Sequence, residues 1–366
     1  MKRLVNILLL LMVSLSMLRC DATIHEYPDS SKWTYQVPFT LSFEFDTNMP
    51  IYQQIEHMTR NSLTGDDLDL RYIVKVYKAT QWEGEIDEDL LVDTFVYSKS
   101  DVAEWNYQTE LELENGEYDI VVWADYVDAG TTSHKYYNAD NFSHIFNTGA
   151  IPNDRLGTVA PDEDYPYSGS NDFRDAFVGR TRVALDKENI GTTIVVPMER
   201  PLAKYRFIAV DLESFISRME TMKKKQMEAS RGDDDTKVDT KVTIDLNDYY
   251  VVFSYNSYVN TSFHALMNAP ISNQNISFKS TIRKLNDAEA EIGFDYVFVN
   301  GSKASVYVWL DVYDKDGTWV GGVNQFPVPL LRSKLTEVRG TFLTLQESGG
   351  IGISPGFDDE FTMEID

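Results

Sequence analysis

Short runs of alternating apolar and polar residues recur along this chain and limit the folds open to it. The run "VPFTLSFEF", residues 37–45, would place four apolar side chains on one face of an extended segment: Phe39, Leu41, Phe43 and Phe45. The run "KASVYVWLDVYD", residues 303–314, alternates in the same way. A period of two residues is typical of a strand with one buried face, so the chain is predicted to be built from half-buried strands.

Further segments rich in β-branched and aromatic residues are predicted as strands, because those residues favour the surface of a sheet. They are "LRYIVKVYK" (70–78), "GEYDIVVWADYV" (116–127), "TTIVVPM" (192–198), "AKYRFIAVDL" (203–212), "KVTIDL" (241–246), "YYVVFSY" (249–255) and "AEIGFDYVFV" (290–299). The pair Asn115–Gly116 is a strong signal for a tight turn. Many short strands separated by Gly, Asn and Asp predict antiparallel β-sandwiches.

The N-terminus has the pattern of an export signal. Lys2 and Arg3 precede an apolar run over residues 4–18, which is shorter than the roughly 20 residues that a membrane-spanning helix needs. Cys20, the only cysteine, lies directly after this run. The position favours bacterial lipoprotein processing, with residues 1–19 removed as a signal peptide and a diacylglycerol on the Cys20 thiol. A plain signal peptide with an incidental cysteine is the alternative, because Arg19 is irregular beside the cut.

The chain exceeds the size that one hydrophobic core usually serves, so two domains are expected. The boundary is placed near "MERPLAKY", where Pro201 interrupts two strand-like runs, which gives β-sandwich domains over residues 20–200 and 201–366. Between Leu212 and Met222, apolar residues recur at spacings of three and four. This predicts one amphipathic helix over residues 211–229, inserted between the first two strands of the second domain.

Charge excludes nucleic acid as a partner. The chain has 33 Lys and Arg against 58 Asp and Glu, for a formal net charge of −25. A chain this acidic is repelled by nucleic acid and by anionic head groups, so membrane association would depend on the acyl chains. A hydrophobic content of 43% is ample for packed cores and excludes a disordered acidic polymer.

Motifs for catalysis or metal binding are weak. The run "YDKDGTW", residues 313–319, resembles the start of a calcium loop, but Thr318 and Gln325 stand where further ligands are required. A hairpin turn is therefore the favoured interpretation. The five histidines form no HExxH pattern, and neither a GxSxG elbow nor a phosphate-binding glycine loop is present. No enzyme activity, catalytic residue, metal site or cofactor is predicted.

The six tryptophans could include a platform on which sugars stack. Several of them lie within strand patterns or beside turns, so packing in the core or at strand edges is the favoured interpretation.

Several segments together resemble an uncharacterised family of lipoproteins from Bacteroidales-type bacteria, which is similar in turn to the fimbrillins, the subunits, anchors and tips of fimbriae. They include "LENGEYDIVVWADYVD", "RDAFVG", "VPMERPLAKYRFIAVDLE", "LNDAEAEIGFDYVFVNGS" and "GGIGISPGFDDEF". The resemblance covers Ile24 to Ile365. It implies a mainly β fold of two tandem transthyretin-like antiparallel β-sandwich domains and carries over no catalytic residue.

The resemblance also implies a mechanism of assembly. In many fimbrillins a protease cuts after an arginine in the loop that follows the first strand, and a C-terminal strand from another subunit fills the groove left by that strand. Here the removable strand would be "VPFTLSFEF", and the inserting strand would be "FTMEID". The candidate cut is at Arg60, which lies in the loop "QQIEHMTRNSLTGDDLD". The alternative for each is ordinary: a permanent first strand, an uncut loop, and a last strand that completes its own domain.

The leading hypothesis is a surface-exposed, lipid-anchored outer-membrane protein of fimbrillin type, acting as pilus subunit, anchor or adhesin. Its partners would be other fimbrillin-like subunits, or ligands on host or bacterial surfaces. The first alternative is a carbohydrate- or protein-binding surface lipoprotein associated with nutrient uptake, which an exposed coplanar aromatic pair would favour. The second is a hydrolase, which would need a pocket with convergent, unpaired carboxylates.

Overall fold

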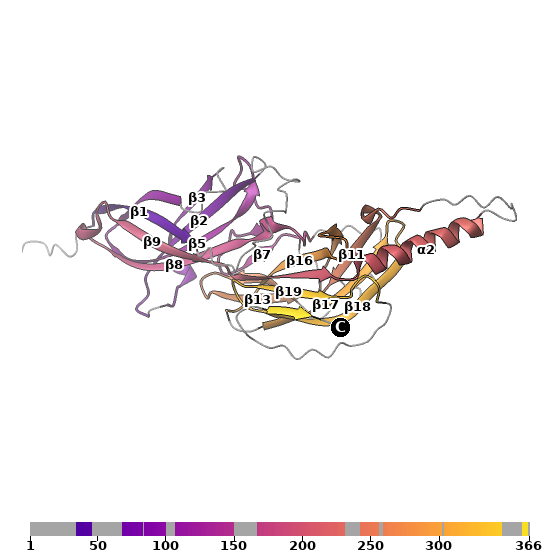
Figure 1. Ribbon diagram of the computed structural model, residues 1–366. Helices are drawn as coiled ribbons and strands as arrows, with labels where there is room; N and C mark the ends of the chain where they lie inside the picture. The colour runs from indigo at the N-terminus through magenta and orange to yellow at the C-terminus, as the bar shows by residue number, and fades with distance from the viewer. Residues whose placement is uncertain are drawn as a thin grey trace, which may run out of the picture.

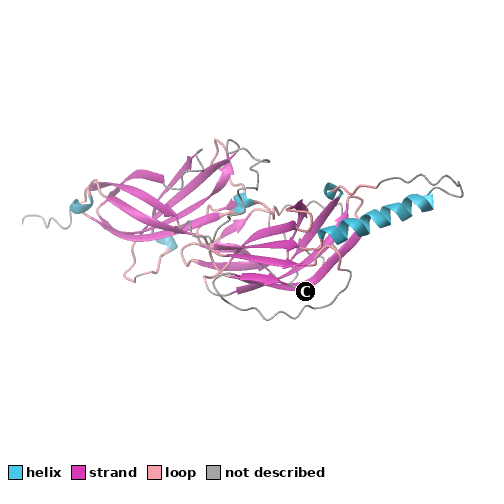
Figure 2. Cartoon of the chain, in the orientation of Figure 1, coloured by secondary structure: helices cyan, strands magenta, loops and turns pink. Residues whose placement is uncertain are grey.

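The computed structural model describes residues 34–45, 68–82, 84–99, 107–149, 167–230, 242–255, 259–301, 304–345 and 361–364. Strands dominate these ranges, and one long helix, α2 (Leu212–Ser230), extends from the end of the second sandwich (Figures 1 and 2). The predicted mainly β fold of tandem sandwiches is confirmed. Helix α2 lies in the chain between two strands of the second sandwich, β10 and β11, which confirms the predicted insertion.

The first sandwich is a seven-stranded sheet, in the order β3-β2-β5-β8-β9-β1-β4 over the described residues. Its strands are β1 (Gln36–Phe45), β2 (Leu68–Lys78), β3 (Leu91–Lys99), β4 (Tyr107–Glu114), β5 (Gly116–Asp128), β8 (Ala176–Leu185) and β9 (Thr193–Glu199). Strands β8 and β9 pair only at Val178 with Glu199 and at Gly179 with Met198. The sheet therefore folds over at this point, and apolar side chains of both halves share one core.

The second sandwich has two separate sheets, with a core between them. Over the described residues, one has the order β15-β16-β10-β19-β20 and the other the order β14-β11-β17-β18. The strands are β10 (Leu202–Ala209), β11 (Tyr249–Ser254), β14 (Ser277–Thr281), β15 (Arg283–Lys284), β16 (Ala290–Phe298), β17 (Ala304–Asp314), β18 (Trp319–Leu330), β19 (Leu335–Gly340) and β20 (Phe361–Glu364).

A small third sheet connects the two sandwiches. It has the order β13-β12-β7-β6 over the described residues and consists of β6 (Tyr137–Asn138), β7 (Ile145–Asn147), β12 (Val259–His264) and β13 (Ala269–Gln274). Behind it lies a third apolar cluster, in which Trp123 of β5 packs against Phe263 of β12 and Phe298 of β16. This cluster contains residues from both sides of residue 200, so the two sandwiches share buried apolar surface. The division into two domains at residue 200 therefore stays a prediction.

The alternating runs form the expected strands. In β1 the side chains of Val37, Phe39, Leu41 and Phe43 are buried, and β17 buries every second residue. The turn after β17 is a hairpin, as predicted: the Asp314 carboxylate accepts hydrogen bonds from the backbone N–H groups of Asp316 and Thr318.

One predicted strand is wrong. Residues 242–245 of "KVTIDL" form no strand, and a short 3₁₀ turn, η7 (Leu246–Asp248), follows them. The Asp245 carboxylate accepts a hydrogen bond from the backbone N–H of Asn247, and this local cap competes with strand pairing.

We expect Gly179→Ala to lower the free energy of unfolding by about 1–3 kcal/mol, because it overpacks the point at which the first sheet folds over. A Cβ atom at this position would lie 2.4 Å from Met198 Sδ and 2.9 Å from the carbonyl oxygen of Pro197. Urea unfolding measures the change. A loss below about 0.5 kcal/mol would show that the sheet accommodates a methyl group at this point without overpacking.

Candidate functional site

Strand β1 occupies a slot in the first sheet. It pairs antiparallel with β4, from Gln36 opposite Glu114 to Phe43 opposite Tyr107. On its other side it runs parallel to β9, from Thr40 opposite Thr193 onward. The strand is therefore hydrogen-bonded along both edges, although it is the first described strand of the chain.

The side chains of β1 contribute a large part of the first core. Full burial of a Val, Leu or Phe side chain is worth roughly 1.5–3 kcal/mol, and Val37, Phe39, Leu41 and Phe43 are all buried. The Phe43 ring also stacks on Tyr72 at 5.1 Å and on Tyr107 at 5.9 Å between ring centroids. Without β1, the facing edges of β4 and β9 would expose unpaired backbone groups above an apolar groove, which a strand of another chain could fill.

The last described strand lies at a sheet edge. Strand β20 runs parallel to β19, with Phe361 opposite Thr336 and Glu364 opposite Arg339. It is the terminal strand in the order of that sheet over the described residues. In this structure the C-terminal strand therefore joins a sheet of its own chain, and within the described ranges its pairing covers four residues, all of them along β19.

A buried polar cluster lies where the sandwiches meet. Arg174 donates from Nη1 to Asp295 Oδ1 at 2.6 Å and from Nη2 to Asn147 Oδ1 at 2.9 Å. Its guanidinium lies 3.8 Å from the centroid of the Tyr167 ring. The hydroxyl of Tyr137 donates to the Arg174 carbonyl at 2.6 Å. Arg174 thus connects the loop before β8 to β16 of the second sandwich.

The Asp295 carboxylate has a full set of donors. Besides Arg174, it accepts from the hydroxyls of Tyr255 at 2.6 Å and Tyr167 at 3.0 Å, and from the backbone N–H of Tyr296. Burial raises the pKa of Asp295, and the Arg174 guanidinium lowers it. A carboxylate with this many partners stabilises the junction and has little capacity left for a ligand.

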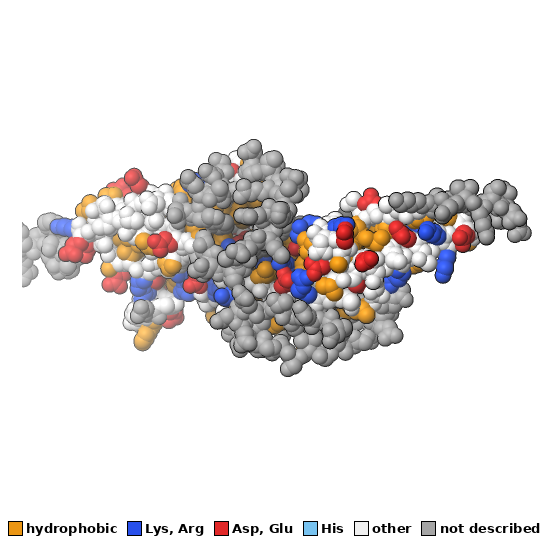
Figure 3. Space-filling model, in the orientation of Figure 1, with side chains coloured by type: hydrophobic (Ala, Val, Ile, Leu, Met, Phe, Trp, Pro, Cys, Tyr) orange, Lys and Arg blue, Asp and Glu red, His pale blue; other side chains and the backbone are white. Residues whose placement is uncertain are grey.

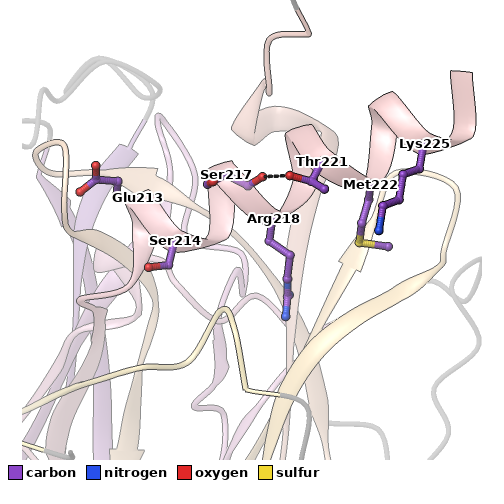
Figure 4. A pocket seen from close by; sticks show the side chains of 7 residues that line it. All are labelled: Glu213, Ser214, Ser217, Arg218, Thr221, Met222 and Lys225. Carbon is purple, nitrogen blue, oxygen red and sulfur yellow. Dashed lines mark hydrogen bonds between the residues drawn. The ribbon is translucent and has the colours of Figure 1, made fainter. Parts of the chain in front are cut away.

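Two pockets lie on the described part of the surface, one beside α2 and one beside Arg174. Figure 4 shows one of about 640 Å³ beside α2, into which Arg218 points. The Arg218 guanidinium already donates to the carbonyl oxygens of Val320, Leu343 and Thr344, so it ties α2 to the sandwich. The second pocket, of about 300 Å³, lies beside Arg174 between Gly149 and Tyr167, and the chain between those residues is outside the described ranges.

On the face drawn in Figure 3, acidic and basic side chains are interspersed over both sandwiches. Within the described ranges, no three His, Cys, Asp or Glu side chains gather where they could hold a metal ion. Over the same ranges, no helix combines the length and apolar composition needed to cross a bilayer.

A family model for a family of unknown function, DUF6562, matches residues 34–366. The chain belongs to this family. A search of curated proteins finds no significant match.

Solved structures with a similar arrangement of strands are distant in sequence from this DUF6562 chain. A candidate polysaccharide-binding protein from Bacteroides thetaiotaomicron is 14% identical, with 79% of this chain and 80% of that chain covered and a TM-score of 0.42. A candidate adhesin from the same species is 12% identical, covering 83% and 91%, with a TM-score of 0.42. The fimbrial anchor protein Mfa2 from Porphyromonas gingivalis is 12% identical, covering 78% and 82%, with a TM-score of 0.34.

The predicted site residues of this DUF6562 chain are only partly placed. Cys20 and Arg60 lie outside the described residues, and only the backbone of Phe361–Glu364 is described. Sequence reasoning missed Arg174 and Asp295. The sequence does contain a signal for Asp295, because this acidic residue lies in the middle of the apolar run "AEIGFDYVFV".

We expect Arg174→Met to lower the free energy of unfolding by about 3–5 kcal/mol, because it leaves the Asp295 carboxylate buried without its cation. The matched control is Lys284→Met, which removes a cation from an exposed pair with Asp287 and should cost less than about 0.5 kcal/mol. Urea unfolding of both variants gives the comparison. Equal losses in the two variants would contradict a special role for the junction pair.

Proposed function

We propose that this protein is a surface-exposed, lipid-anchored protein of fimbrial type, serving as pilus subunit, anchor or adhesin and assembling by exchange of strands. The observation that supports this most is the placement of β1. It is buried and paired on both edges, and the segment that leads from it to β2 contains Arg60. A cut at Arg60 would leave β1 attached to the core only by non-covalent contacts. Because Cys20 precedes β1 in the chain, a subunit that loses β1 also loses the lipid, so an anchor subunit would keep both.

The short pairing of β20 supports the same proposal. In the described part of the chain, β20 pairs over four residues along β19 and so loses less on release than β1, which is paired along both edges. The C-terminal strand is therefore the one suited to leave its own sheet and enter the vacated slot of a neighbour. Backbone hydrogen bonds would supply affinity, and the alternating side chains would fix the register.

The proposed action is binding and assembly without catalysis. The buried carboxylates of Asp125, Asp175 and Asp295 are each paired with an arginine, namely Arg71, Arg200 and Arg174. Paired carboxylates of this kind hold a structure together and lack the free proton-transfer capacity that a hydrolase requires.

We expect Cys20→Ser to abolish incorporation of a labelled fatty acid and to release the protein from the membrane fraction. The thiol is the proposed attachment point of the lipid, and a serine hydroxyl does not replace it. Ser16→Ala, within the same signal, is the matched control and should leave labelling unchanged. A Cys20→Ser protein that stays in the membrane fraction as firmly as wild type would refute the lipid anchor.

We expect limited digestion with an arginine-specific protease to cut after Arg60 first, and the nicked protein then to form a ladder of oligomers on gels of low denaturant content. Deletion of Phe361 to Asp366 should stop the ladder while the monomer keeps its thermal unfolding transition, because the exchanged strand is missing but the cores are intact.

Arg60→Lys is the control for this experiment, since it keeps the charge but removes the cleavage site. It should remain whole and monomeric. If Arg60 resists digestion, and deletion of the C-terminal six residues unfolds the monomer, both strands belong permanently to their own sheets and the exchange mechanism is wrong.

A further inference from the structure

The outer face of the β14-β11-β17-β18 sheet has a row of aromatic side chains. Along β17, the side chains that alternate with the buried residues point outward: Tyr307, Trp309, Asp311 and Tyr313. Neighbouring strands add two aromatic residues, because the register places Tyr250 of β11 and Trp319 of β18 on either side of Tyr313. The aromatic side chains therefore extend both along β17 and across three strands.

Two rings of this face are in contact, and two others are open to solvent. Tyr250 and Tyr313 are stacked, with centroids 5.6 Å apart and planes 20° apart. The Lys279 ammonium lies 4.1 Å from the Tyr250 ring centroid and covers it from the side of β14. Trp319 remains 43% exposed and Tyr307 remains 41% exposed. Contiguous apolar patches that stay exposed are typical of interaction sites.

Asp311 lies among these rings with spare capacity as an acceptor. Its Oδ1 accepts a hydrogen bond from Trp319 Nε1 at 2.9 Å, and its described neighbours supply no ion pair. Burial raises the pKa of the Asp311 carboxyl, and the Trp319 hydrogen bond lowers it. An ionised carboxylate has about four acceptor positions, so Asp311, with one donor from the protein, keeps acceptor positions that water or a ligand can occupy.

A glycine preserves the space at this acid. Gly322 of β18 is paired with Asp311, and a Cβ atom there would lie 3.0 Å from Asp311 Oδ1 and 2.4 Å from the carbonyl oxygen of Leu310. Any other residue would push against the carboxylate or the backbone of β17. Glycine at this position therefore leaves room for the Asp311 carboxylate and its hydrogen bond with Trp319.

This combination fits the chemistry of a sugar. One face of a pyranose ring is lined by C–H groups that pack on aromatic rings, while its rim carries hydroxyl donors that a carboxylate accepts in pairs. From Tyr307 to Tyr313 the row spans roughly 20 Å of strand, at about 3.3 Å per residue. It is long enough to accommodate several linked sugar units. The Asp311 carboxylate and the net charge of −25 disfavour an anionic chain.

We propose that this aromatic face, formed by Tyr250, Tyr307, Trp309, Asp311, Tyr313 and Trp319, binds a neutral polysaccharide that lies along β17. The inference deepens the proposed surface function by naming a class of ligand, and it rests on that function for its biological setting. It requires neither the lipid at Cys20 nor cleavage at Arg60, so it can fail or succeed independently of them.

The test is affinity electrophoresis of the purified full chain in native gels that contain galactomannan, xyloglucan or yeast mannan, with polygalacturonate as the anionic comparison. We expect retardation in at least one neutral polysaccharide and none in polygalacturonate. For the polysaccharide that retards the chain, Trp319→Ala and Tyr313→Ala should each weaken binding by about tenfold, and Asp311→Asn by about threefold or more.

Two further variants separate binding from structure. Trp319→Phe keeps an aromatic face but loses the N–H donor, so it should retain more affinity than Trp319→Ala. Trp82→Ala removes a tryptophan that is 62% exposed on the other sandwich and should change nothing. Thermal unfolding of each variant verifies that it is folded.

The proposal is overturned if no neutral polysaccharide retards the chain, if only polygalacturonate does so, or if folded Trp319→Ala and Tyr313→Ala bind as well as wild type. In the last case the sugar binds elsewhere. Retardation by a neutral polysaccharide that depends on these residues would support the site even if the chain never forms oligomers.

Discussion

The arrangement of the two sandwiches depends on the buried pair of Arg174 and Asp295. Apolar contacts such as those of Trp123 with Phe298 supply surface burial at the junction, but hydrophobic attraction has no preferred direction. The ion pair is directional: its guanidinium also holds Asn147, and its carboxylate holds the Tyr255 hydroxyl. A wrong docking of the sandwiches would bury two unpaired charges. The pair therefore selects one orientation more than it adds stability.

The two proposed activities lie on different sandwiches. Strand β1 contributes to the core of the first sandwich, whereas the aromatic face lies on the outside of a sheet whose inner face belongs to the core of the second. Exchange of a strand at β1 would perturb the first core and leave the register of β11, β17 and β18 intact. A chain of this design could assemble through one sandwich and bind a ligand through the other.

The local sequence pattern is sufficient to predict most of the strands and the helix. The alternation around Phe39 and around Val308 predicts β1 and β17, and apolar spacing predicts α2. It failed at residues 242–245, where the cap formed by Asp245 outweighs the β-branched residues. The sites depend on contacts across long separations, and no local pattern reports these. Arg174 and Asp295 are 121 residues apart, and Trp319 joins the aromatic row only because an irregularity near Tyr313 shifts the register.

Two aspartates on strands of the same sandwich illustrate why residue type alone could not identify the sites. Asp295 is buried among an arginine, two tyrosine hydroxyls and a backbone N–H, so its acceptor positions are occupied within the chain. Asp311 is half-buried, has one indole donor and faces solvent between aromatic rings. Both carboxyls have a pKa raised by burial, but only one is compensated by an arginine. Inside the protein the Asp311 carboxylate receives one hydrogen bond, from the Trp319 indole, and its solvent-facing acceptor positions are open to donors from a ligand.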